Sequence, residues 1–220
     1  TFKKESIDSV ALSSIDGIRS VSCVLEQSAM AESEGRRVLI TLKGVDRNYP
    51  KTLPIAERLI SGSFTTELDE ESSIVVGQRI AMQLALQRDG LGREVGLYSI
   101  NRQRISSLLK MGGYTRRDLP VAGIFSIDED NGLVGFTSLS MAQELFNYQG
   151  RISSVELSLE PEADPQQVAE PIKALLGEEF RVQTRYESNS IYRLMNLERW
   201  GVFFIAVIVM IVASLSIVGT

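Results

Sequence analysis

The spacing of apolar residues in the first part of the chain predicts a short helix followed by a β-hairpin. Between Lys4 and Ile15, apolar side chains recur at intervals that place them on one face of a helix. Two stretches rich in β-branched residues follow, Ile18–Ala31 and Arg37–Gly44, with the polar turn Ser33–Gly35 between them. Because a short turn between two such stretches is typical of antiparallel strands, we expect them to pair.

The middle of the chain alternates between short strand patterns and two helical ones. The helical patterns cover Gly77–Gln87 and Ser138–Tyr148, and the strand patterns cover Ser73–Val76, Arg93–Ile100, Leu119–Ile127 and Leu133–Phe136. In the first of these helices, Ile80, Met82 and Leu84 are expected to face inward. Ser138 or Ser140 is expected to cap the second, because a serine hydroxyl accepts a hydrogen bond from a free backbone amide.

The next region returns to an order of strand, helix and strand. Ile152–Leu159 and Phe180–Tyr186 have the strand pattern, and Asp164–Leu176 between them has the helical one. Together with the N-terminal helix and hairpin, this order predicts one split α+β unit made of residues 1–49 and 150–188. Residues 50–149 would then be an insertion built mainly from strands.

Residues 200–220 form an apolar run without a charged residue or a proline. At about 1.5 Å of rise per residue, about 20 helical residues cross the hydrocarbon layer of a membrane. Trp200 stands where an interfacial aromatic residue belongs, next to the charged Arg199. We therefore expect residues 189–220 to form a stalk and a transmembrane helix of a larger membrane protein. A buried core helix is the alternative.

The composition removes several classes of function. The chain has no histidine, which excludes a Ser-His-Asp triad and a histidine-ligated zinc site, and its single cysteine excludes an internal disulfide. The net charge of −5 argues against broad binding to nucleic acid. The acidic stretches Glu67–Glu71 and Asp128–Asp130 are interpreted as solvated loops. We therefore expect a non-catalytic chain with no metal or cofactor of its own.

Residues 101–117 form a long basic stretch in a chain that is acidic overall. It combines basic side chains with apolar ones: Arg102, Arg104, Lys110, Arg116 and Arg117, and Ile105, Leu108, Leu109, Met111 and Tyr114. Its length exceeds the ~2–5 residues of an ordinary hairpin loop, and loops of this length are commonly functional or disordered. Basic side chains with an apolar tip can bind an acidic partner that offers a hydrophobic pocket. A solvated hairpin, or one packed on its own domain, is the alternative.

Several motifs, taken in their order, resemble a known family of transporters. Four stretches are similar to segments of lipoprotein-releasing ABC transporter permeases of the LolC/LolE type, which have a MacB-like periplasmic domain. They are IVVGQRIAMQLAL at residues 74–86, REVGLYSI at residues 93–100, KMGGYTRRDLPVAGIF at residues 110–125 and LVGFTSLSMAQELF at residues 133–146. The sequence LERW followed by an apolar run matches the same pattern, so the resemblance covers about residues 17–220.

This resemblance implies a fold and a set of partners. Residues 1–49 and 150–188 would form a split porter-like subdomain, and residues 50–149 an inserted, mainly β, sabre-like subdomain. The protein would lie in the bacterial inner membrane with most of this chain in the periplasm. A separate cytoplasmic ATPase subunit would bind ATP and Mg²⁺ and drive a motion that the membrane helices transmit. The further partners implied are a second permease subunit (in a homodimer or heterodimer), a lipoprotein substrate, a periplasmic lipoprotein carrier and membrane lipid.

The resemblance also implies a hook-like loop and a basic pad that receive the carrier. The candidate residues for this contact are Arg102, Arg104, Leu108, Leu109, Met111, Arg116 and Arg117, with Met111 in the tip region and Arg116 and Arg117 at the pad. Gly96 stands near a further pad position that is basic in the family. Arg199 and Trp200 would lie at the membrane interface. An efflux permease of the MacB type, or a membrane-anchored signalling or regulatory module without transport, are the alternatives.

Overall fold

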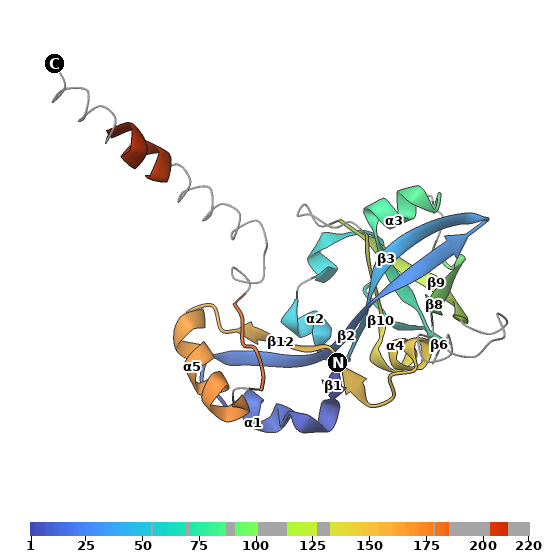
Figure 1. Cartoon of the computed structure of the whole chain (residues 1–220). Coiled ribbons are helices and arrows are strands. Elements are labelled where there is room, and N and C mark those ends of the chain that lie inside the picture. Colours follow the sequence, from blue (N-terminus) through green and yellow to red (C-terminus); the bar gives the residue numbers. More distant parts are fainter. Residues whose placement is uncertain are drawn as a thin grey trace, which may run out of the picture. The chain divides into compact units, whose positions relative to one another are not determined.

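The computed structural model describes residues 1–53, 55–68, 71–86, 91–100, 114–126, 133–177, 179–184 and 203–210 (Figure 1). The chain divides into two compact units, Thr1–Glu162 and Ala163–Thr220. The described strands all belong to the first unit, together with several short helices, and the longest described helix belongs to the second. The expected α+β class is therefore confirmed.

The first unit is organised around a long hairpin of β2 (Ile18–Ser33) and β3 (Arg36–Val45), drawn in blue in Figure 1. Every residue of β3 has a partner on β2. At the tip, Glu34 and Gly35 have φ angles of 49° and 77°, as the two central residues of a tight hairpin turn require. The hairpin expected from the sequence is confirmed.

Beyond the hairpin, the sheet closes on itself. β3 pairs with β10 (Val134–Ser138), β10 with β7 (Ile74–Gly77), and β7 with β9 (Tyr114–Phe125). β8 (Glu94–Ile100) then joins β9 to the far part of β2. The strands β2, β3, β10, β7, β9 and β8 thus form a closed sheet whose side chains alternate between the inside and the outside.

The part of β2 nearest the N-terminus has another partner. β12 (Ser154–Leu159) pairs with the start of β2 as far as Val24, whereas β8 pairs with β2 from Met30 to Glu32. One end of the hairpin therefore pairs with β12, and the rest of it belongs to the closed sheet, whose other strands come from residues 50–149. The porter-like and sabre-like boundaries themselves stay a prediction.

Two buried clusters stabilise the first unit. One lies inside the closed sheet and includes Ile40, Ile74 and Leu97. The other is aromatic, and the Phe136 ring lies 5.4–5.6 Å, centroid to centroid, from the rings of three neighbours, Tyr49, Phe64 and Phe125. Burying one side chain of this size contributes roughly 1.5–3 kcal/mol, so both clusters matter for stability.

Capping residues determine where the helices begin. In α4 (Leu139–Phe146), the hydroxyl of Ser138 accepts a hydrogen bond from the backbone amide of Met141, so Ser138 is the cap. In α1 (Ser9–Ser13), the Asp8 carboxylate accepts hydrogen bonds from the first backbone amides of the helix. The helix therefore begins at Ser9, later than the expected start at residue 4.

The helix α3 (Gln78–Gln83) corrects one expectation about the core. Ile80 is fully buried and Leu84, just after the helix, is 1% exposed, but Met82 is 70% exposed. Residues two positions apart lie on different faces of a helix, so Met82 points away from the face that its neighbours bury. The expectation that it faces inward is wrong.

Shorter elements complete the first unit. They are η1 (Lys4–Ser6), α2 (Tyr49–Thr52), η2 (Ile55–Arg58), the edge strand β4 (Leu59–Gly62) and the two-residue strands β1 (Phe2–Lys3), β5 (Glu67–Leu68), β6 (Glu71–Ser72) and β11 (Arg151–Ile152). β4 pairs with the end of β9.

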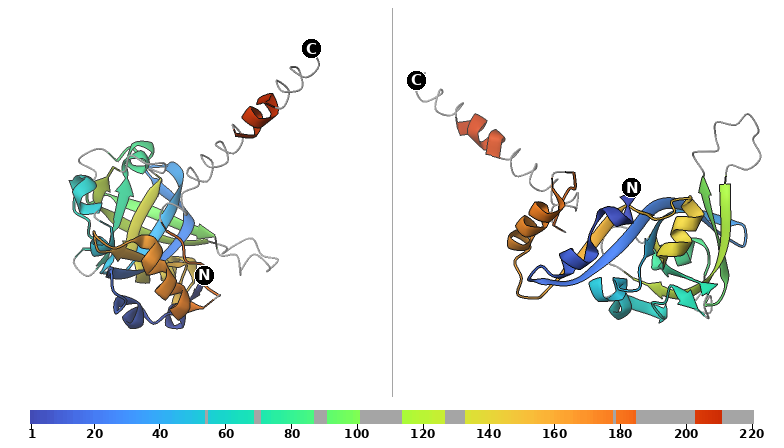
Figure 2. Two further views of the ribbon diagram at one scale, coloured as in Figure 1. Left: turned by 90° about the vertical axis from the view of Figure 1, so that its left-hand side faces the viewer. Right: turned by 90° about the horizontal axis from the view of Figure 1, so that it is seen from below.

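The second unit contains α5 (Pro165–Leu176), which is capped by the Asp164 side chain and ends at Gly177 with a φ of 72°. The strand expected at residues 180–186 is absent from its described part, residues 180–184. Residues 203–210 are helical (Figure 2). Most of the predicted stalk and transmembrane helix at residues 189–220 lies outside the described residues. Among those that are described, no helix has the length and apolar character needed to cross a bilayer.

Candidate functional site

Four strands of the closed sheet, β3, β2, β8 and β9, present a continuous outer face. Because successive side chains of a strand point to opposite sides, strand pairing determines which residues share that face. One row across the strands holds Leu39, Met30, Tyr98 and Arg116, and the next row holds Arg37, Glu32, Gly96 and Asp118. We call these residues, together with Tyr114 on β9, the ribbon face.

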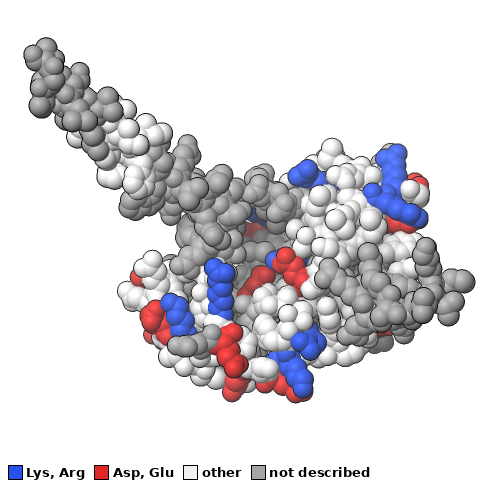
Figure 3. Space-filling model, in the orientation of Figure 1, with Lys and Arg blue, Asp and Glu red and all other residues white. Residues whose placement is uncertain are grey.

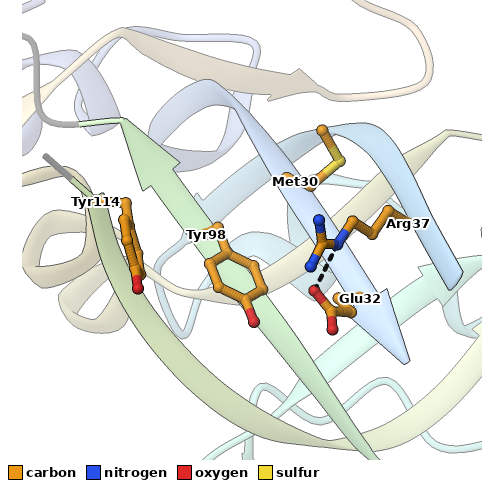
Figure 4. A pocket seen from close by; sticks show the side chains of 5 residues that line it. All are labelled: Met30, Glu32, Arg37, Tyr98 and Tyr114. Atoms are coloured by element: carbon orange, nitrogen blue, oxygen red, sulfur yellow. Dashed lines mark hydrogen bonds and ion pairs between the residues drawn. The ribbon is translucent and has the colours of Figure 1, made fainter. Parts of the chain in front are cut away.

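The apolar part of the ribbon face is open to solvent. Leu39, Met30 and Tyr114 are exposed by 61%, 36% and 65%, and the rings of Tyr98 and Tyr114 lie 5.9 Å apart, centroid to centroid. Figure 4 shows the pocket between these strands, which has a volume of about 410 Å³ and is lined by Met30, Glu32, Arg37, Tyr98 and Tyr114. Ligand pockets in proteins typically have volumes of about 300–1,000 Å³, so this one could receive a small group of a partner.

The guanidinium of Arg116 is held by two neighbours. Its Nε and Nη2 atoms donate hydrogen bonds to Asp118 Oδ1 over 2.9 and 2.8 Å, and its central carbon lies 5.2 Å from the centroid of the Tyr98 ring. The hydrogen bonds to Asp118 raise the pKa of Arg116. A cation above an aromatic face is attracted by the ring electrons, so Arg116 both neutralises Asp118 and holds Tyr98.

Gly96 leaves the space that this arrangement needs. A Cβ atom at this position would lie 3.0 Å from Asp118 Oδ1 and 3.3 Å from Arg116 Nη2. A longer side chain would therefore have to displace the pair. The sequence resemblance pointed to a basic residue near this position. Here the Arg116–Asp118 pair lies over the glycine.

A second ion pair borders the pocket. Arg37 Nε donates to Glu32 Oε2 over 2.8 Å, and this hydrogen bond lowers the pKa of Glu32. Partial desolvation raises the pKa of Tyr98, while the positive charge of Arg116 opposes that rise. The ion pairs Arg37–Glu32 and Arg93–Glu34 place basic side chains next to acidic ones near the tip of the β2–β3 hairpin, toward the upper right of Figure 3.

Arg117 does not belong to the ribbon face. As the next residue on β9, it points to the other side of the strand and pairs with Glu144 of α4. Its Nη1 atom also donates to the backbone carbonyl of Arg116 over 3.0 Å. The two arginines that the sequence placed in one basic pad thus lie on opposite sides of β9, and each has a carboxylate partner.

The structure tests only part of the predicted contact region. Arg116 and Arg117 were expected in a loop, but β9 begins at Tyr114, so both lie on a strand paired with β8. The remaining hook and pad candidates, Arg102, Arg104, Leu108, Leu109 and Met111, lie outside the described residues, as do Arg199 and Trp200.

Sequence reasoning missed Leu39, Met30, Glu32 and Arg37 as members of this surface. These residues lie on the N-terminal hairpin, more than 50 positions before Gly96 and its neighbours on β8 and β9. The available signal was local: Met30 and Leu39 stand between residues that the strand pattern buries. An exposed apolar residue at such a position is not by itself informative, and only the pairing with β8 brings it beside Tyr98.

A different polar cluster lies where β12 meets the hairpin. Lys43 Nζ lies 3.0 Å from Glu156 Oε1 and 3.2 Å from Glu26 Oε2, and the hydroxyl of Tyr49 donates to Glu156 Oε2 over 2.9 Å. We call these residues the Lys43 cluster. Burial alone would lower the pKa of Lys43, but the two carboxylates outweigh it and raise the pKa. Burial and the charge of Glu156 also raise the pKa of Tyr49.

The acidic stretches show no sign of a metal centre in the part of the chain that the structure describes. Glu67 forms an ion pair with Arg47 at 3.0 Å. Among the described residues, no group of three or more histidine, cysteine, aspartate or glutamate side chains could hold a metal ion. Cys23 is buried, and burial raises the pKa of its thiol.

Comparison with known proteins connects this fold to a family. The family model of the MacB-like periplasmic core domain matches residues 1–175. The extracellular domain of the noncanonic ABC-type transporter YknZ from Gram-positive bacteria is similar in structure, with a TM-score of 0.57, 18% identity, and coverage of 81% of this chain and 83% of that one. The periplasmic region of MacB from Actinobacillus actinomycetemcomitans has a TM-score of 0.54 and 17% identity, with coverage of 80% and 75%. None of the curated proteins matches the sequence.

Proposed function

Because the chain belongs to the MacB-like periplasmic core domain family, we propose that it is the extracytoplasmic domain of an ABC transporter permease that passes lipoproteins from the inner membrane to a soluble periplasmic carrier protein. Similar folds occur in the transporters MacB and YknZ. The transfer of lipoproteins is the specific part of the proposal, and it depends on a contact between this domain and the carrier.

The observation that supports this proposal is the length of the connection between the paired strands β8 and β9. The last pair of the two strands is Ile100 with Tyr114, so β8 ends and β9 begins at one end of the ribbon face. This connection is longer than a hairpin needs. Its basic and apolar residues suit a contact with another protein, and the exposed Tyr114 of the ribbon face is the first residue of β9.

The remaining parts of the transporter follow from the same proposal. ATP and Mg²⁺ are bound by a separate cytoplasmic ATPase subunit, and this chain performs no chemistry. Residues 189–220 act as stalk and membrane helix, with Arg199 and Trp200 at the membrane interface. They transmit the motion of the ATPase to the extracytoplasmic domain, and a second permease subunit completes the pair.

An efflux permease is the second candidate, favoured by the structural likeness to the periplasmic region of MacB. Such a permease works with an adaptor protein and needs no carrier. The two candidates therefore differ in the soluble protein that the domain binds. A signalling module without transport would differ from both in having no ATPase subunit.

The test uses the full-length permease with its ATPase in lipid nanodiscs and the purified carrier protein. Replacing residues 101–113 with a two-residue Asn-Gly turn, or introducing Met111→Asp, is expected to abolish carrier capture while the complex still assembles and hydrolyses ATP. Lys51→Asp, an exposed change on α2, is the control. Unchanged capture by both variants contradicts the proposal, and capture of an adaptor instead of a carrier supports efflux.

A further inference from the structure

Two basic side chains stand side by side on the strand pair β1–β11, near the N-terminus in Figure 1. Lys3 lies directly opposite Arg151, and Phe2 lies opposite Ile152. Ile152 is buried and Phe2 half-buried, whereas Lys3 and Arg151 are both exposed. Because directly opposed residues of an antiparallel pair project to the same side, the two cations share the outer side of this pair. We call Lys3 and Arg151 the basic corner.

No carboxylate neutralises the basic corner among the residues that the structure describes. None of the ion pairs in that part of the chain includes Lys3 or Arg151. The acids nearest to Lys3 in the sequence do not fill this role: Asp8 accepts hydrogen bonds from the first amides of α1, and Glu5 belongs to none of the same ion pairs. The arginines of the ribbon face, by contrast, each pair with a carboxylate. The basic corner therefore keeps its positive charge.

The guanidinium of Arg151 is positioned for a second contact. Its Nη2 atom donates to the backbone carbonyl of Thr1 over 2.8 Å, and the backbone carbonyl of Arg151 accepts a hydrogen bond from Gln143 Nε2 over 2.9 Å. The Thr1 carbonyl orients the guanidinium without neutralising it, and a guanidinium has five N–H donors. An oxyanion can therefore bind the remaining donors while it contacts the ammonium of Lys3.

Such an anion would also relieve a repulsion within the fold. Like charges directly opposite each other destabilise an antiparallel pair, and β1–β11 consists of only two residue pairs in register. A strand pair as short as this opens locally more readily than the core strands do. A bound anion should therefore hold β1 against β11, and this coupling makes the binding measurable.

The apolar run at residues 200–220 indicates where the anion comes from. It carries no charge and is long enough to cross a bilayer, so in the proposed function it holds the domain beside a membrane surface. That surface carries the phosphates of anionic phospholipids, which attract basic side chains over a short range. The chain as a whole has a net charge of −5, so an anionic surface repels most of it and favours approach by an uncompensated basic site.

We propose that the basic corner binds the headgroup phosphate of an anionic phospholipid, with Lys3 and Arg151 contacting the same phosphate. Charge complementarity argues for this partner, because two neighbouring cations without a carboxylate suit a phosphate, and the lipid surface is the source of phosphate to which the chain is joined. The inference rests on the proposed function for the presence of the bilayer. It goes beyond that function by assigning a lipid-binding site to the extracytoplasmic domain.

The experiment measures amide hydrogen exchange by mass spectrometry in the full-length permease and ATPase complex. One set of nanodiscs contains only phosphatidylcholine, and the other contains a mixture of phosphatidylcholine and phosphatidylglycerol. We expect the amides of β1 and β11 to exchange about threefold more slowly in the anionic nanodiscs, because relief of a cross-strand repulsion shifts the local opening equilibrium by a few-fold. Raising the salt from about 50 to about 500 mM should remove the difference.

Two neutralising variants and a matched control locate the site. Lys3→Gln and Arg151→Gln each remove one cation, and either change should abolish the slowing by anionic lipid. Arg79→Gln is the control, because Arg79 is an exposed arginine on α3, and the slowing should persist in that variant. Inorganic phosphate added to the phosphatidylcholine nanodiscs at matched ionic strength tests whether a dissolved anion suffices, and we expect no slowing from it.

The outcomes separate the inference from the proposed function. A complex that assembles in nanodiscs but exchanges equally in both lipid compositions would overturn the inference alone. Slowing that persists in either neutralising variant, or that dissolved phosphate reproduces, would do the same. Failure of residues 189–220 to hold the chain in a bilayer would overturn the membrane part of the proposed function as well. Slowing that is confined to anionic lipid and is lost in Lys3→Gln and Arg151→Gln supports the inference.

Discussion

The β2–β3 hairpin has charged side chains in two settings, the exposed ribbon face and the Lys43 cluster. In the ribbon face, the side chains of Arg37 and Glu32 are 67% and 21% exposed, whereas those of Lys43 and Glu156 are 21% and 30% exposed. The distances within the two pairs are similar, at 2.8 and 3.0 Å. What differs is the amount of water that each cation has lost: Arg37 keeps most of its exposure, whereas Lys43 keeps little.

That difference decides what each group of charges does. A solvated pair gains little from its partner, because water stabilises the separated charges almost as well. A charge that has lost much of its water depends on its partner, and removing one member leaves the other stranded. We infer that the Lys43 cluster serves the stability of the fold, while the ribbon-face pairs mainly balance the charge of an exposed surface.

The largest effect is expected from Lys43→Met, which keeps most of the side-chain stem and removes the charge. Glu156 and Glu26 then face each other without a cation, and we expect the free energy of unfolding to fall by about 2 kcal/mol. Equilibrium unfolding in urea measures this loss. Lys51→Met, the same change at an exposed position of α2, is the control. Equal losses for both variants would remove the distinction between the two settings.

A smaller effect is expected from Tyr49→Phe. The ring and its packing against Phe136 remain, but Glu156 loses a hydrogen-bond donor, so a loss of about 1 kcal/mol is expected. Because this residue belongs to the same group of contacts as Lys43, the losses in the double variant should not add. Full additivity, measured by the same unfolding experiment, would show that the residues act independently.

Alkaline pH should weaken the same cluster. The pKa values of Lys43 and Tyr49 are raised in the folded chain above their ordinary values of 10.5 and 10.0. The folded state then holds its protons more tightly than the unfolded state does, so stability is fully present below pH 10 and is lost as pH rises beyond it. Unfolding curves at several pH values should show a shallower alkaline decline in Tyr49→Phe. An identical decline would contradict the assignment.

The smallest effect on stability is expected from Arg37→Ala on the ribbon face. The Arg37 side chain is 67% exposed, so the unfolding midpoint should scarcely move. The variant should nevertheless change the titration of its partner: Glu32 has a pKa below its ordinary 4.5 because Arg37 donates to it. The pKa measured by NMR should therefore rise in Arg37→Ala. An unchanged pKa would mean that the pair does not persist in solution.

The expectations that succeeded were those with local causes. Ser138 caps α4 because its hydroxyl reaches an amide only three residues away. Gly35 permits the tight turn of the hairpin through its own backbone conformation. The failures have non-local causes: β9 begins at Tyr114 because β8 offers it partners as far as Ile100, which no pattern within residues 101–117 reveals.

By itself, the sequence determined the α+β class and the long hairpin. Its lack of histidine and its single cysteine also excluded histidine-based catalysis and an internal disulfide. These follow from periodicity, turn residues and composition, which act over a few positions along the chain. Only the tertiary structure decided that Met30 lies beside Tyr98, that Arg116 and Arg117 lie on opposite sides of β9, and that each arginine is neutralised. Strand register sets those neighbours, and register is a property of how distant segments pair, since a shift by one residue turns every side chain to the other face.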